Sequence, residues 1–322
     1  MSISTDHSDL PVLLLYNLDP AWTPAELDEA RQEAAKLETG LRSVGHPVTT
    51  LAIDQPDLIA PLAQYAPEDY VVFNWCEGVP GLPWSDALVA QRLEAMHFTY
   101  TGAPPDVLTH CQDKGVVKHQ LERHGFTTPR WRLYTTPACD DWTCFPAIVK
   151  PSRVHCSFGV TPEAVVLTPG ELRRRIGYVL DEFHQPALVE DFIDGREFHV
   201  GLWGNGTIQM LPPAEMDFAA FDDVRDRLCT YDAKFDATSR HYQDIQLRLP
   251  APLTDAEYQL LETTAIATYR RLGCRDYARL DLRLRDSEFY VLDVNPNADL
   301  SSEASLAIAA EVAGSVVHRF DI

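Results

Sequence analysis

"YARLDLRLRDSEFYVLDVNPN", residues 277–297, is the stretch that decides how the C-terminal part of this chain folds. Polar and apolar residues alternate on both sides of a short polar segment, which is typical of an antiparallel β-hairpin. If residues 286–288 form a three-residue loop, Asp281 lies opposite Asp293. One face of the hairpin is then apolar and suited to a core, and it consists of Leu280, Leu282, Leu284, Tyr290, Leu292 and Val294.

The other face of this hairpin carries charges that oppose each other. The same register places Arg279 opposite Asn295, beside Asp281 and Asp293. Like charges directly across a sheet are destabilising, so a bound divalent cation would compensate for the two aspartates. Ligands that are all oxygen favour Mg²⁺ or Mn²⁺ over zinc. The alternative is that this face is solvated and the two carboxylates repel each other only weakly.

Composition excludes several classes of protein. The chain has 322 residues, 45% hydrophobic and 23% charged, which indicates a globular protein of two or three domains. A formal charge of −21 argues against binding nucleic acid or an anionic membrane through overall charge, although a local basic pocket remains possible. We find no apolar run of membrane-spanning length, no secretory signal, and seven scattered cysteines that we interpret as reduced thiols. We therefore expect a cytoplasmic protein.

Strands and helices alternate in the first part of the chain. Buried-type strands are predicted at 12–17, 48–53 and 70–75, and a capping box with proline at the first helical position starts a helix at Thr23. This alternation predicts a parallel sheet with helices on its faces, ending near Pro104.

The rest of the chain follows a mixed pattern. Helices are predicted at 113–125, 168–184 and 254–272, and strands at 145–150, 187–193 and 197–203. The polar segment 231–252 has little core content, and we expect it to be a long mobile loop.

Two strand ends carry residues suited to chemistry. Lys150 ends the strand "AIVK", and Ser157 and Gly159 in the next turn could let backbone N–H groups approach a phosphate, or could belong to an ordinary surface turn. The strand exit at Phe192 and Ile193 could present backbone groups and an apolar wall to a flat ring, or could be a core strand leaving its sheet.

The order of these motifs resembles the ATP-grasp superfamily, and within it the D-alanine–D-alanine ligases. "YTG" at 100, "DKGVVK" at 113, "AIVKPS" at 147, "VEDFIDGREF" at 189, "YDAKF" at 231, "YARLDL" at 277 and "LDVNPN" at 292 follow the family's order. The resemblance implies an ATP-grasp fold of the α/β (α+β) class with three domains. These are an N-terminal Rossmann-like parallel domain at 1–104, a small central α+β domain at 105–187 and a larger C-terminal α+β domain at 188–322.

The resemblance also implies a nucleotide site between the central and C-terminal domains. The residues that would bind ATP are Lys114, Lys150, Glu190, Phe192, Ile193 and Glu197. The lysines would contact the phosphates, Glu190 and the two apolar residues would hold the adenine, and Glu197 would bind the ribose. Two Mg²⁺ (or Mn²⁺) ions would be bound by Asp281, Asp293 and Asn295.

Three further residues would take part in catalysis by the same resemblance. Arg279 would face the reacting carboxyl group, Lys234 would close over the phosphates, and Ser157 would occupy the loop after the strand lysine. The implied activity is an ATP-dependent carboxylate–amine ligase, which forms an amide or dipeptide through an acyl phosphate. A homodimer is also possible.

The chain departs from the family where amino acids would bind. "YNLDPAWTP" replaces the glycine-rich segment after the first strand, Glu77 stands where many relatives have histidine, and Asp293 replaces the usual glutamate. We therefore expect altered amino-acid pockets. Glu77 would pair with a substrate ammonium, or would be a surface loop acid, and Ser305 would hold the acceptor carboxylate. Two alternatives stay open, a true cell-wall D-alanine–D-alanine ligase and a nucleotide-binding module without turnover.

Overall fold

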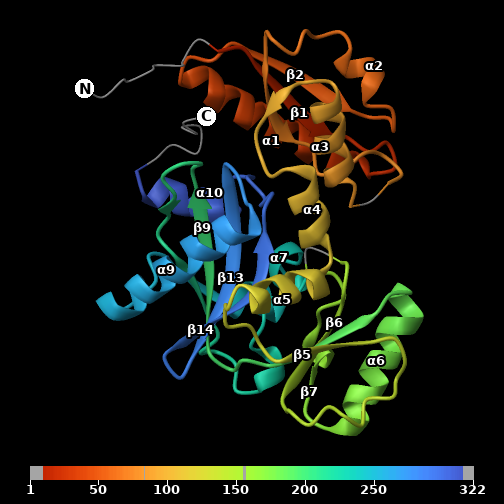
Figure 1. Cartoon of the computed structure of the whole chain (residues 1–322), viewed down its shortest axis with the longest axis vertical. Helices are drawn as coiled ribbons and strands as arrows, with labels where there is room; N and C mark the ends of the chain where they lie inside the picture. The colour runs from red at the N-terminus through yellow and green to blue at the C-terminus, as the bar shows by residue number, and fades with distance from the viewer. Residues whose placement is uncertain (1–9, 83, 155–156, 315–322) are drawn as a thin grey trace.

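The computed structural model describes residues 10–82, 84–154 and 157–314, apart from the side chains of Lys234 and Phe235, and it contains three sheets (Figure 1). The N-terminal sheet is parallel and the other two are antiparallel. This confirms the predicted α/β (α+β) class. No helix among the described residues is long and apolar enough to cross a membrane.

The parallel sheet has the strand order β2-β1-β3-β4. Its strands are β1 (Val12–Asn17), β2 (Val48–Ile53), β3 (Val71–Trp75) and β4 (Thr99–Tyr100), and its helices are α1 (Pro24–Ser43), α2 (Ile59–Leu62), α3 (Asp86–Ala95) and α4 (Pro105–Gln112). The capping box is confirmed, because Thr23 Oγ1 accepts from the Glu26 N–H and the Glu26 carboxylate accepts from the Thr23 N–H. Buried β1 side chains alternate between two hydrophobic clusters, as expected for a sheet covered on both faces.

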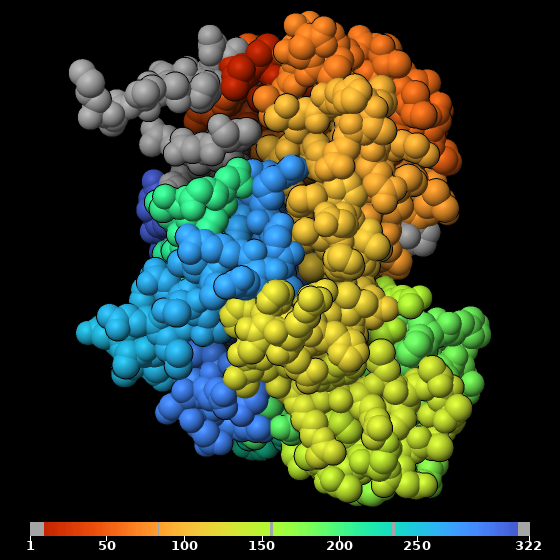
Figure 2. Space-filling model, in the orientation of Figure 1, coloured from red at the N-terminus to blue at the C-terminus, as the bar shows by residue number. Residues whose placement is uncertain are grey.

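The central sheet has the order β5-β8-β6-β7. It consists of β5 (Trp131–Tyr134), β6 (Ala147–Pro151), β7 (Val165–Val166) and β8 (Ala187–Asp191), with the 3₁₀ turn η1 (Pro162–Ala164) and helix α6 (Pro169–Phe183). Leu172, Ile176 and Val179 of α6 pack against Val149 and Val189 of the sheet. Helix α5 (Lys114–Arg123) precedes this unit and, with α4, connects it to the N-terminal part (Figure 2).

The C-terminal sheet has the order β12-β11-β9-β13-β14, with β10 also paired to β9. Its strands are β9 (Arg196–Trp203), β10 (Gln209–Met210), β11 (Ala214–Asp217), β12 (Gln246–Arg248), β13 (Tyr277–Arg285) and β14 (Glu288–Asn295). Val200 and Leu202 of β9 pack in one cluster with helix α9 (Asp255–Leu272). Gly201 faces the other way, toward Leu306 of helix α10 (Ser305–Val312), so the two helices cover opposite faces.

The hairpin of β13 and β14 turns differently from the prediction of a three-residue loop, which was wrong. Arg285 pairs with Glu288, so the turn has two residues, and both Asp286 and Ser287 have positive φ, 53° and 62°. A turn of this kind matches the twist of the two strands. Phe289 and Val291 therefore face the core in place of Tyr290 and Leu292.

A β-bulge then restores the predicted pairing at the polar end of the hairpin. Leu282 pairs with Val291 but Asp281 pairs with Asp293, so Leu292 is the extra residue. Beyond the bulge, Arg279 lies opposite Asn295 as predicted. The facing aspartates thus depend on the bulge as much as on the turn.

The segment 231–252 contains regular structure where the sequence predicted a loop. Helices α7 (Asp232–Phe235) and α8 (Arg240–Asp244) follow the 3₁₀ turn η2 (Val224–Asp226), and β12 pairs antiparallel with β11. The side chains of β12 are exposed, so the strand is held by backbone pairing with β11 and leaves no apolar pattern in the sequence.

We predict that Ser287→Gly stabilises the protein by roughly 0.5–1 kcal/mol, because glycine adopts positive φ without the steric cost that a Cβ atom brings. The free energy of unfolding, measured by urea titration, checks this. A loss of stability in this variant would contradict the two-residue turn.

Candidate active site

A cavity of about 700 Å³ is lined by strands of the central and C-terminal sheets, and by α1 and the segment after β3 from the N-terminal part. Among its lining residues are nearly all those selected from the sequence: Glu77, Lys114, Lys150, Ser157, Glu190, Phe192, Ile193, Glu197, Arg279, Asp281, Asp293, Asn295 and Ser305. The side chain of Lys234 lies outside the described part of the chain, but its neighbour Ala233 lines the same cavity. The tertiary structure therefore brings together candidates that are up to 228 residues apart, from Glu77 to Ser305.

A buried charge triad lies beneath this cavity. The Glu190 carboxylate is 2.6 Å from Lys118 Nζ through one oxygen and 2.8 Å from Lys150 Nζ through the other. Burial alone would raise the pKa of Glu190, but the two lysines lower it to about 2. The Lys118 and Glu190 side chains are each 1% exposed and Lys150 is 16% exposed; Glu190 and Lys150 line the cavity, whereas Lys118 lies behind them.

Lys118 also anchors the bulged strand. Its ammonium group donates to the backbone carbonyls of Val291 and Leu292, at 3.3 Å and 2.7 Å, and to Thr128 Oγ1 at 2.9 Å. It therefore connects α5, β8 and the bulge of β14. The sequence placed Lys118 on a helix with Lys114 but assigned it no role; its spacing of four residues from Lys114 was the only available signal.

Protein cations neutralise the two facing aspartates of the hairpin. Arg279 donates to both oxygens of Asp281, at 2.8 Å and 3.1 Å, and Lys114 Nζ lies 3.0 Å from Asp293 Oδ2. Burial would raise the pKa of Asp281, but Arg279, with His199, holds it below its ordinary value. The local like-charge repulsion that we read from the sequence is thus already compensated without a metal ion.

The same residues still fit a hard cation. Asp281, Asp293 and Asn295 offer only oxygen and amide groups, and Asn295 Nδ2 lies 3.4 Å from Asp281 Oδ2. Mg²⁺ and Mn²⁺ prefer oxygen donors of this type. A cation would share these carboxylates with Arg279 and Lys114, so its binding would depend on how strongly the two side chains hold them.

The strand exit after β8 forms another part of the cavity. Arg283 donates to Glu197 Oε2 at 2.8 Å and to the Ile193 carbonyl at 2.8 Å, and its guanidinium lies 4.6 Å from the Phe192 ring centroid. The Glu190 carboxylate is bound to Lys118 and Lys150, so it does not point toward a ring bound at this strand exit, where the family resemblance led us to expect it to hold the adenine. The sequence did not identify Arg283 as part of the site, because its Glu197 partner lies 86 residues away.

The loop after β6 contacts the segment that precedes α7. Ser157 has a φ of 59°, and the Phe158 ring packs edge-on against Tyr231 with centroids 5.8 Å apart. Phe158 is also 53% exposed. Residues 155 and 156 of this loop lie outside the described part of the chain.

The opposite end of the cavity is acidic. Glu77 follows β3, and although its side chain is reached by solvent through the cavity, the surrounding protein together with Asp299 and Asp86 raises its pKa to about 7. Ser305 starts α10 nearby on the same cavity. Glu77 is thus an exposed acid on the cavity wall whose raised pKa makes it a candidate for the site.

Solved structures have the same architecture. The D-alanine–D-alanine ligase of Bacillus anthracis, in a crystal structure complexed with ATP, matches with a TM-score of 0.72 over 96% of this chain and 94% of that one, at 19% sequence identity. A second structure of the ligase from that organism gives the same TM-score and identity. The fold of this protein is therefore that of the ATP-grasp ligases.

Sequence comparison shows the family. The model described as "D-ala D-ala ligase C-terminus" matches residues 118–318, and this chain belongs to that family. An uncharacterized protein, y4sG, of Sinorhizobium fredii is 32% identical over 87% of this chain and 82% of its own length. A D-alanine–D-alanine ligase of Pseudothermotoga lettingae is 27% identical over 88% of this chain and 91% of its own.

We predict that Glu190→Gln lowers the free energy of unfolding by about 3–5 kcal/mol, because it leaves Lys118 buried without its counterion. Chemical denaturation measures this. The free energy of unfolding should fall less in the double variant Lys118→Met/Glu190→Gln than in Glu190→Gln, because the double variant no longer buries a lysine without its counterion. Glu311→Gln, an exposed acid of α10, should stay within about 0.5 kcal/mol. A single variant as stable as this control would contradict the triad.

Proposed function

We propose that this protein is an ATP-dependent carboxylate–amine ligase whose amino substrates differ from those of the D-alanine–D-alanine ligases. The observation that carries the proposal is the grouping of Lys114, Lys150 and Arg279 around Asp281 and Asp293 in one cavity of a ligase-family fold. A nucleotide-binding module without turnover has no need of an arginine held beside the metal-type carboxylates. ATP is a bound ligand in the Bacillus anthracis relative.

The proposed reaction proceeds in two displacements. A carboxylate oxygen attacks the γ-phosphate of ATP, ADP leaves, and an acyl phosphate forms. An amine then attacks the acyl carbon, phosphate leaves, and the amine gives up a proton. Negative charge accumulates first on the transferred phosphoryl group and then on the tetrahedral oxygen, so fixed cations supply the main stabilisation.

Each cation of the cavity would stabilise a different part of the reacting substrates. Lys114 and Lys150 would bind phosphate oxygens. Arg279, whose pKa is raised by Asp281 despite burial, would stay charged and would stabilise the reacting carboxyl group. A bound Mg²⁺ or Mn²⁺ would add neutralisation of phosphate charge at Asp281, Asp293 and Asn295. The Phe158–Tyr231 contact would help exclude water, which would otherwise hydrolyse the acyl phosphate.

The acidic end of the cavity supports an ammonium-bearing substrate. Besides the carboxylates of the central and C-terminal strands, the cavity is lined by six from the N-terminal part and the segment before α10: Glu29, Glu33, Glu77, Asp86, Asp299 and Glu303. Their combined field attracts cations and repels anions. We infer that the amine substrate carries positive charge, with Glu77 as a partner of its ammonium group and Ser305 as a partner of a carboxylate.

A true D-alanine–D-alanine ligase is the second candidate, because several relatives at about 27% identity carry that name. The carboxylates around Glu77 favour a ligase with a different amino substrate, because alanine carries only one ammonium group to pair with several carboxylates. Phosphate release with D-alanine as sole amino acid would favour the second.

We predict that a phosphate-release screen over paired D- and L-amino acids and diamines identifies an active pair, with the product confirmed by mass. Asp281→Asn should lower kcat by at least about 100-fold, because it removes a charged ligand and frees Arg279. The matched control Asp286→Asn, at the exposed turn of the same hairpin, should retain activity within about twofold. Full activity in Asp281→Asn would exclude its role in metal binding.

We predict that the KM for the amine substrate rises as the pH falls below about 7, by about tenfold per pH unit, because Glu77 then becomes protonated and loses the charge that binds ammonium. Glu77→Gln should raise this KM by about tenfold or more at pH 8 and remove its pH dependence. The KM for ATP should not change. An unaltered amine KM in the variant would remove Glu77 from the substrate site.

A further inference from the structure

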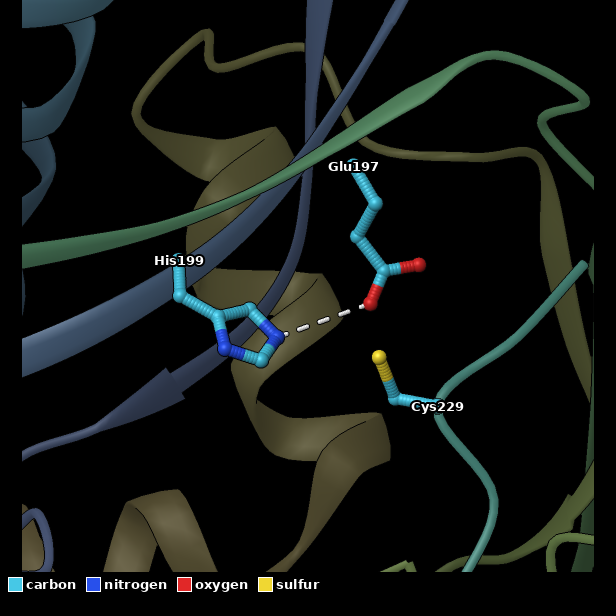
Figure 3. A group of neighbouring side chains, drawn as sticks. All are labelled: Glu197, His199 and Cys229. Atoms are coloured by element: carbon cyan, nitrogen blue, oxygen red, sulfur yellow. Dashed lines mark ion pairs between the residues drawn. The ribbon is translucent and has the colours of Figure 1, made fainter. Parts of the chain in front are cut away.

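Three side chains with different donor atoms converge at the strand-exit end of the cavity (Figure 3). Glu197 and His199 are two residues apart on β9, so they project from the same face of the sheet. Cys229 comes from the segment between η2 and α7. One carboxylate oxygen, one imidazole nitrogen and the sulfur lie within 4.8 Å of one another, and the His199 and Glu197 side chains are only 7% and 9% exposed.

The two oxygens of Glu197 have separate environments. Both short contacts from Arg283, at 2.8 Å and 2.6 Å, go to Oε2. Oε1 instead faces His199 Nε2 at 3.6 Å, which is longer than a hydrogen bond. Oxygen and nitrogen ligands of a tetrahedral zinc ion lie about 3.3 Å apart, given metal–ligand distances of about 2.0–2.1 Å. The pair is therefore spaced like two ligands of one metal ion.

We propose that Glu197, His199 and Cys229 form a binding site for one soft divalent cation of the Zn²⁺ class. A thiolate, an imidazole and a carboxylate form a donor set that suits zinc, whereas Mg²⁺ does not use sulfur. Cys229 binds as the thiolate and releases its proton to solvent. All three residues line the cavity, which leaves the remaining coordination position to a ligand from that side.

This site is chemically distinct from the carboxylates of the hairpin, although the two are adjacent. His199 pairs across the sheet with Asp281, so one strand spacing separates the mixed donor set from the all-oxygen set. Selectivity follows from the donors: the sulfur and nitrogen select the softer ion, and the oxygen set selects the harder one.

Binding of a cation at this site would weaken binding of a nucleotide in the cavity, and this consequence rests on the proposed function. The cation would take Glu197 Oε1, the oxygen that Arg283 does not contact, and would connect β9 to the segment leading into α7, which carries Lys234. Nucleotide and soft cation would then compete. The protein would lose nucleotide affinity when free Zn²⁺ is high and regain it when a chelator is added.

Cobalt(II) titration of the reduced full-length chain tests the site directly, because a cobalt–thiolate bond gives a near-ultraviolet charge-transfer band and zinc displaces cobalt. We expect one equivalent to bind with this band. Cys229→Ser should abolish the band, and His199→Gln should weaken binding by at least about tenfold. The matched control Cys144→Ser, a cysteine of the central sheet's core cluster, should keep both the band and the affinity.

A wild-type chain without the band, or a Cys229→Ser variant that keeps it, would overturn the cation site. Circular dichroism of each variant confirms that it is folded. In a separate assay, Zn²⁺ should weaken binding of an ATP analogue to the wild type but not to Cys229→Ser. A cobalt band without nucleotide binding would support the cation site and contradict the proposed function, while nucleotide affinity unaffected by Zn²⁺ would contradict the competition.

Discussion

The buried Lys118–Glu190–Lys150 triad is the interaction on which the arrangement of the cavity depends. One carboxylate with two ammonium groups leaves a net positive charge in the interior, which is tolerated because Lys118 also donates to two backbone carbonyls of β14. The triad thereby joins the central sheet, α5 and the C-terminal sheet through contacts that cannot be replaced by water. Apolar packing could hold these elements together, but it would not specify which carbonyl of β14 faces α5.

The bulge at Leu292 determines which side chains of the hairpin face the cavity. Without the extra residue, a two-residue turn would place Asp281 opposite Leu292 and send Asp293 to the other face. With it, Asp281 and Asp293 face each other, and Arg279 and Lys114 balance them. The hairpin therefore carries a compact set of two acids and two cations, in which each carboxylate has a protein counterion within 3.1 Å.

Charge is distributed unevenly along the cavity. In a chain with a formal charge of −21, lysines and Arg279 are gathered beside the hairpin, while carboxylates line the end near Glu77. This separation is the basis of the proposal that a polyanion binds at one end and an ammonium group at the other. At the strand exit, Glu197, His199 and Cys229 add a third environment with softer donors. The three environments lie on neighbouring strands, so ligands at one would affect occupancy of the next.

Local sequence alone determined the parallel N-terminal sheet, the Thr23 capping box and the strand carrying Lys150, because alternation and capping residues act over a few positions. It also placed Asp281 opposite Asp293, but through a three-residue turn that was wrong. Nearly all the site residues that the order of motifs selected do line the cavity, although many other lining residues, such as Arg283, His199 and Cys229, were not selected. Only the tertiary structure decided the two-residue turn with its compensating bulge, the burial of Lys118, and the choice of Arg279 and Lys114 as counterions. These depend on contacts between residues far apart in the chain, such as Lys118 with Leu292, 174 positions away, and no local pattern encodes them.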